Sequence, residues 1–115
     1  MLWLINEGNI KAYQVRLSEA ELTYAKECFI KYFGKDDHLW LFGSRVDDNA
    51  RGGDIDFYVQ TQKSAKEAVY AETMFNVGLQ EKIGEQKIDV VLHLINEPFT
   101  LPIYKVAQEK GVLLI

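Results

Sequence analysis

The chain has little that would suit secretion or direct nucleic-acid binding. It contains a single cysteine, Cys28, which cannot form an internal disulfide, so we expect a reducing compartment and a cytoplasmic protein. Its net charge of −4 provides no basic face, which argues against direct binding of nucleic acid. The apolar stretch at residues 2–5 is too short for a signal-peptide core or a membrane span, so no membrane association is expected.

The composition is that of an ordinary globular protein. Hydrophobic residues make up 48% of the chain and aromatic residues 12%, which argues against disorder. A length of 115 residues suffices for one hydrophobic core but not for a second lobe. No internal repeat, low-complexity tract or linker divides the chain, so we expect a single domain over residues 1–115.

Apolar periodicity and turn residues predict alternating helices and strands. Ser18 and Glu21 have the spacing of a capping box, and the helix that they begin should end at Gly34. Strands are expected at residues 38–42, 54–60 and 87–94, with a loop at 43–53 and a helix at 62–83. A short helix closed by Gly111 and a terminal strand or apolar tail follow, while residues 1–17 could form a strand or an extended arm. The apolar positions expected in the helix at 62–83 are Ala65, Val69, Met74, Val77 and Leu79.

Two acidic side chains open the second predicted strand. Asp54 and Asp56 should project from the same face, roughly 6–7 Å apart along the strand. Carboxylates this close repel one another, and a divalent cation would neutralise them. The alternative is a pair of solvated residues, but aspartate is a poor strand former and the flanking residues are apolar. The pair therefore predicts a metal site.

The turn before this strand carries small and polar residues. Gly43 and Ser44 offer unhindered backbone N–H groups and a hydroxyl, which suit phosphate oxygens. They could instead simply form a tight turn. Arg45 is interpreted either as a contact to a triphosphate or partner, or as a surface residue. Together with the two aspartates, this turn suggests a site for a magnesium-bound nucleoside triphosphate.

A third carboxylate follows on the strand at residues 87–94. The helix between the second and third strands predicts a crossover connection, which makes these strands parallel. Asp89 would then lie at the same end of the sheet as the aspartate pair. The alternative is a single charge at a strand edge, paired with Lys87. His38 and His93 are less suited to this site, because Mg²⁺ prefers oxygen ligands.

These motifs carry a family resemblance. GS, nine residues and then DID within an apolar strand resembles the signature of the DNA polymerase β-like nucleotidyltransferase superfamily. The flanking segments LFGSR and GGDIDFYV are most similar to minimal nucleotidyltransferase (MNT) domains, which often pair with a HEPN-domain partner in toxin–antitoxin modules. The resemblance implies an α/β fold like the polymerase β palm, with a small mixed β-sheet and helices packed on one face.

The resemblance also implies a reaction. It is transfer of a nucleoside monophosphate, AMP from ATP or another NTP, to a hydroxyl acceptor such as a tyrosine of a HEPN toxin, so that the protein acts as an antitoxin. Asp54, Asp56 and Asp89 would hold two Mg²⁺ ions and act in catalysis, while Gly43, Ser44 and Arg45 would bind nucleotide. The alternatives are a non-catalytic antitoxin that neutralises its partner by complex formation, and a stand-alone enzyme acting on a small-molecule hydroxyl. An oligomer is compatible with each of these.

Overall fold

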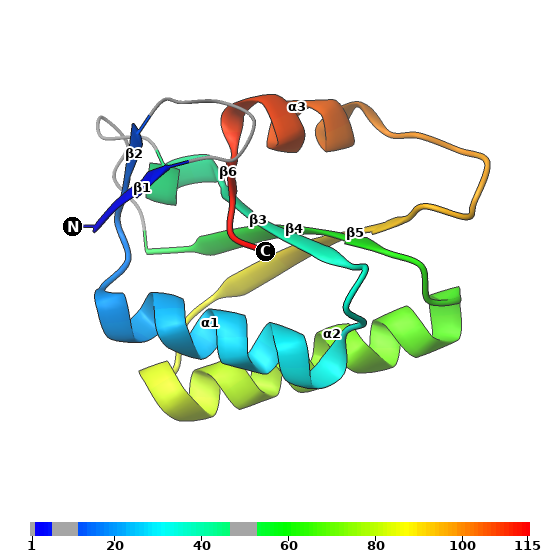
Figure 1. Ribbon diagram of the computed structural model, residues 1–115. Helices are drawn as coiled ribbons and strands as arrows, with labels where there is room; N and C mark the ends of the chain where they lie inside the picture. Colours follow the sequence, from blue (N-terminus) through cyan, green and yellow to red (C-terminus); the bar gives the residue numbers. More distant parts are fainter. Residues whose placement is uncertain (1, 6–11, 47–52) are drawn as a thin grey trace.

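A four-stranded mixed sheet forms the centre of the molecule, with helices on both faces (Figure 1). The computed structural model describes residues 2–5, 12–46 and 53–115. Two helices, α1 (Glu19–Tyr32) and α2 (Ala65–Ile83), cover one face, and α3 (Pro102–Lys110) lies on the other. The predicted α/β class is therefore confirmed. The expected helical layer on one face is formed by α1 and α2, and α3 adds a partial cover on the opposite face.

The strand order explains how the chain links the two faces. The sheet runs β5 (Ile88–Leu94), β4 (Ile55–Thr61), β3 (His38–Phe42) and β6 (Val112–Leu113). As predicted from the crossover through α2, β4 and β5 are parallel. β3 is antiparallel to both of its neighbours. β1 (Leu2–Ile5) and β2 (Ala12–Val15) pair in a separate two-stranded sheet. Of the two predictions for residues 1–17, a strand or an extended arm, the described residues therefore show strands.

The helix starts follow from capping. The Ser18 hydroxyl accepts a hydrogen bond from the Glu21 N–H at 3.0 Å, and a Glu21 oxygen accepts one from the Ser18 N–H at 2.8 Å. This is the predicted capping box of α1. Ser64 and Glu67 form a second one, so α2 begins at Ala65 rather than at the predicted residue 62.

The apolar positions of α2 lie on both its exposed and its buried sides. Val69 and Val77 are 57% and 50% exposed, and Ala65 is exposed too. The buried face of the helix instead contains Ala68, Ala71, Phe75 and Leu79. Phe75 sets this phase, because its ring packs edge-on against Phe57 of β4 at a centroid distance of 5.3 Å. Hydrophobicity alone could not separate the two apolar sides of the helix.

Alternation along β4 divides the core between the two faces of the sheet. Phe57 and Val59 lie in the main core with α1 and α2, whereas Tyr58 packs with Tyr104 and Ala107 of α3. Because side chains alternate along a strand, Asp56 lies on the same face as Tyr58, the face that α3 covers only in part. Within the described ranges no helix combines the length and apolarity needed to cross a membrane.

Candidate active site

The three predicted carboxylates lie at one end of the sheet. In the parallel register of β4 and β5, Asp56 is paired with Asp89, and neighbouring strands are about 4.8 Å apart. Asp54 lies two residues before Asp56, immediately ahead of β4. The parallel pairing thus brings together residues that are more than thirty positions apart in the sequence.

Lys87 lies between two of these carboxylates. Its Nζ atom is 3.5 Å from Asp54 Oδ2 and 3.9 Å from Asp89 Oδ2. The contact with Asp89 is the pairing that had been weighed as an alternative role for that residue. The contact with Asp54 was not expected from the sequence. Both aspartate side chains are 50% exposed, so these ion pairs are well solvated and individually weak.

The surroundings of Asp56 raise the pKa of its carboxyl. Burial raises the pKa of its carboxyl, the charges of Asp89 and Asp54 raise it further, and Lys87 acts in the opposite direction. Each of these causes except the last disfavours the ionised form. Asp56 is therefore held in a position where its negative charge is costly, and a cation bound at this end of the sheet would relieve that cost.

The donor chemistry of the site suits a hard divalent cation. Three carboxylates supply oxygen ligands of the kind that Mg²⁺ prefers. As they stand, no three acidic, histidine or cysteine side chains in the described part of the chain form a ready metal cluster. Asp54 and Asp89 would therefore have to turn from Lys87 towards the ion, and their half-exposed side chains leave room for that rotation.

Gly43 is fitted closely against Asp56. It begins a short 3₁₀ helix, η1 (Gly43–Val46), with a φ of 74°, a conformation that favours glycine. A Cβ atom added here would lie 2.5 Å from Asp56 Oδ2. The glycine was predicted for its access to phosphate, and the structure adds a steric role, which is to leave space for the carboxylate. Ser44 lies in η1, but its side chain is outside the described part, so the role of its hydroxyl stays a prediction.

Arg45 binds the protein itself. Its guanidinium donates to the backbone oxygens of Arg16, Gly53 and Asp54, at 2.6, 3.0 and 3.4 Å, and to Gln86 Oε1 at 3.2 Å. It therefore joins η1 to the chain before α1, to the start of β4 and to the segment before β5. This structural role was not foreseen, because backbone acceptors leave no signal in the sequence. Contact with a triphosphate stays a prediction, and residues 47–52 of the predicted loop lie outside the described ranges.

A polar cluster beneath α3 accounts for His93. The Tyr58 hydroxyl accepts hydrogen bonds from Gln60 Nε2 at 3.0 Å and Gln108 Nε2 at 2.8 Å. Its single hydrogen is then donated to His93 Nδ1, 2.6 Å away. Burial lowers the pKa of His93, and its ring stacks on Tyr104 at 3.9 Å. The histidine is thus held as a neutral packing residue rather than a ligand of the carboxylate site.

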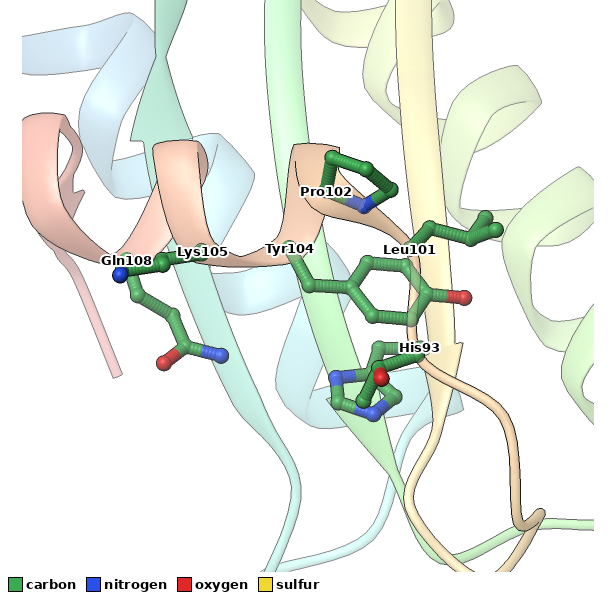
Figure 2. Close-up of a pocket in the computed structure, with 7 residues that line it drawn as sticks. His93, Leu101, Pro102, Tyr104, Lys105 and Gln108 are labelled. Carbon is green, nitrogen blue, oxygen red and sulfur yellow. The ribbon is translucent and has the colours of Figure 1, made fainter.

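An open pocket of about 480 Å³ lies beside this cluster. Figure 2 shows the His93 and Tyr104 side chains meeting below α3, with Gln108 further along the helix. His38, the other histidine weighed as a ligand, has its Nδ1 3.3 Å from the carbonyl oxygen of Ile115. Both histidines therefore have partners outside the carboxylate site.

Comparison with known proteins places the chain in a family. A comparison with curated proteins finds no match. The family model for the nucleotidyltransferase domain matches residues 22–114, a range that includes the glycine turn, all three carboxylates and α3. Nucleotidyl transfer is the activity for which this family is named. Since the match covers most of the chain, the protein belongs to the nucleotidyltransferase domain family.

Proposed function

We propose that the protein transfers a nucleoside monophosphate, AMP from ATP, to a hydroxyl acceptor in a Mg²⁺-dependent reaction. The observation that carries this proposal is the parallel register that pairs Asp56 with Asp89 beside Asp54. In a member of the nucleotidyltransferase family, such a group of carboxylates at one strand end has a direct use. Lys87 balances only part of the charge of the group, and a nucleoside triphosphate arrives with Mg²⁺ that would balance the rest.

Each residue then has a role in the reaction. Asp54 and Asp56 would hold the first Mg²⁺, and Asp56 and Asp89 a second. The bound ions would neutralise the negative charge of the triphosphate. Asp89 would accept the proton of the acceptor hydroxyl, whose oxygen bonds to the α-phosphorus as the bond to pyrophosphate breaks. The backbone of Gly43 and the hydroxyl of Ser44 would orient the pyrophosphate group.

The acceptor that we propose is a tyrosine hydroxyl on a partner protein, a HEPN toxin that the modification would silence. A partner is supported by exposed apolar side chains in α3 and the loop before it, on the sheet face that carries Asp56. Contiguous exposed apolar residues often mark a protein contact. The most exposed of them are Phe99 at 51%, Leu101 at 47%, Val106 at 43%, Ile95 at 42% and Ile103 at 37%.

Intact mass spectrometry of the co-purified partner tests this proposal. The partner is incubated with ATP, Mg²⁺ and either the wild-type protein, Asp89→Asn or the control Asp36→Asn, which changes an exposed turn residue away from the site. We expect an AMP adduct with the wild type and the control. With Asp89→Asn the rate should fall by a factor of about 10² to 10⁴, the contribution of a positioned base. Equal rates for all three proteins would contradict the assigned role of Asp89.

A non-catalytic antitoxin is the second candidate. It is favoured by one observation, that Lys87 already neutralises part of the carboxylate charge without a metal ion. In that case the partner would be neutralised by complex formation alone. Loss of toxicity without any adduct, and to the same extent with wild type and Asp89→Asn, would support this candidate over the transferase.

A further inference from the structure

Lys87 combines a hydrogen-bonded backbone with an exposed charged side chain. Its carbonyl oxygen accepts a hydrogen bond from the Ile55 N–H at 3.0 Å, and Ile55 lies between Asp54 and Asp56 in the chain. Its side chain is 69% exposed, and its ammonium lies within 4 Å of both Asp54 and Asp89. The charged end of the side chain thus occupies the space that two of the proposed metal ligands share, and solvent surrounds it on the other sides.

We infer that Lys87 is an internal counter-cation that a divalent metal ion must displace, and that this exchange couples metal binding to nucleotide binding. The inference rests on the proposed function, since it assigns the same carboxylates to the metal. It assigns to Lys87 a positioning role that neither the family match nor the sequence motifs include.

Electrostatics makes the exchange necessary. An ammonium ion and a divalent cation a few ångströms apart repel each other, so both cannot lie between the same two carboxylates. The carboxylates also have to turn towards the ion, and the positions that they take now are the ones that contact Lys87. Moving Lys87 costs little, because its stem is flexible and exposed ion pairs contribute weakly.

The displaced Lys87 ammonium would bind the triphosphate of the nucleotide. Its backbone anchor keeps it at the end of the sheet where the triphosphate is proposed to bind, and a triphosphate supplies several anionic oxygens. Nucleotide would therefore stabilise the displaced position of Lys87, and the metal ion would release Lys87 to reach the nucleotide. Each ligand then strengthens binding of the other, by the same factor in both directions.

A purely structural role for Lys87 explains less. β4 and β5 are already joined along the whole register from Ile55 with Ile88 to Thr61 with Leu94. Two solvated ion pairs add little to that pairing. A structural role also predicts that loss of Lys87 weakens the binding of every ligand. The counter-cation role predicts instead that loss of Lys87 strengthens the binding of metal alone and reduces the coupling between metal and nucleotide binding.

Mn²⁺ binding measured by calorimetry tests the inference, with and without a non-hydrolysable ATP analogue. The variants are Lys87→Met, Lys87→Arg, which keeps the charge, and the control Lys105→Met. Lys105 is an exposed lysine of α3, 3.8 Å from Glu109, so its loss changes net charge equally. For Lys87→Met we expect Mn²⁺ alone to bind about three- to tenfold more tightly, the range that weak ion pairs allow. The strengthening of Mn²⁺ binding by the analogue should shrink, while Lys87→Arg and Lys105→Met should resemble the wild type.

Three results would overturn the inference. Unchanged or weaker Mn²⁺ binding by folded Lys87→Met refutes the counter-cation role. In that case the proposed function still stands if the wild type binds Mn²⁺ together with the analogue. An equal gain in Lys105→Met assigns the effect to net charge, which also refutes it. If no variant binds Mn²⁺ even with the analogue, both the inference and the proposed metal-dependent transfer fail. Circular dichroism confirms that each variant is folded.

Discussion

Replacement of Gly43 by alanine should damage the site through Asp56. Two costs arise at this position. The φ of 74° is unfavourable for any residue with a side chain, and the new Cβ would lie 2.5 Å from Asp56 Oδ2. The carboxylate cannot stay where it is, so both stability and metal binding should suffer. Gly84 separates the two costs, because its φ is 92° but an added Cβ would meet nothing within 4 Å.

The magnitudes follow from these two glycines. At Gly43 the positive φ itself costs an alanine about 1–2 kcal/mol. Gly84, with φ 92° and ψ 169°, lies in a region that is essentially confined to glycine, so Gly84→Ala should cost about 1–3 kcal/mol with no steric part. Overpacking adds about 1–3 kcal/mol at Gly43, so Gly43→Ala should lose about 2–5 kcal/mol in total. A loss of about 3 kcal/mol would lower Tm by roughly 12–20 °C in a domain of this size. Gly53→Ala should be nearly neutral, since its added Cβ contacts nothing.

Thermal unfolding of a double-mutant cycle is the assay. In an Asp56→Ala background the carboxylate is gone, so the penalty of Gly43→Ala should fall to its backbone part, about 1–2 kcal/mol. Metal binding by Gly43→Ala should also weaken in the otherwise native protein. The steric account is refuted if removal of the Asp56 carboxylate leaves the Gly43→Ala penalty unchanged, or if that removal lowers the Gly84→Ala penalty by the same amount.

Two further predictions concern charge and hydrogen bonding. The pKa of Asp56 is raised in the folded protein above its ordinary value of 3.8. The ionised carboxylate therefore lowers the free energy of unfolding at pH values above the folded pKa, and this cost disappears once the pH falls below the ordinary value. Metal-free Asp56→Asn should therefore be more stable than wild type at pH 7 and equal to it near pH 3, in urea denaturation; a less stable variant at pH 7 would contradict this. Arg45→Met removes the guanidinium from four acceptors and should cost about 1–3 kcal/mol in urea denaturation. Unchanged stability with weaker ATP binding would instead identify Arg45 as a phosphate ligand.

Local sequence signals predicted much of the fold. The Ser18 capping box, the glycine after α2 and the alternation of strands and helices all depend on residues near one another in the chain. The length of the crossover predicted the parallel pairing of β4 and β5, and with it that Asp89 lies at the same end of the sheet as Asp54 and Asp56. The register that pairs Asp56 with Asp89 comes from the structure. The sequence was therefore sufficient to predict that the three carboxylates lie at one end of the sheet.

The missed features depend on distant atoms. Arg45 binds backbone oxygens of segments as far away as Arg16, and such acceptors are the same for every residue type. The contact of Gly43 with Asp56 and that of Lys87 with Asp54 also depend on the packed geometry. The buried face of α2 could not be chosen from the sequence, because apolar residues lie on both its buried and its exposed sides.

Calorimetric titration of ATP with and without Mg²⁺ tests the central claim most directly. The account predicts that the wild type and Asp36→Asn bind ATP much more tightly with Mg²⁺ than in EDTA. Asp56→Asn and Asp89→Asn, whose positions are paired across β4 and β5, should lose most of that difference while remaining folded. Equal ATP affinity of the wild-type protein with and without Mg²⁺ would contradict the assignment of these carboxylates to a metal–nucleotide site.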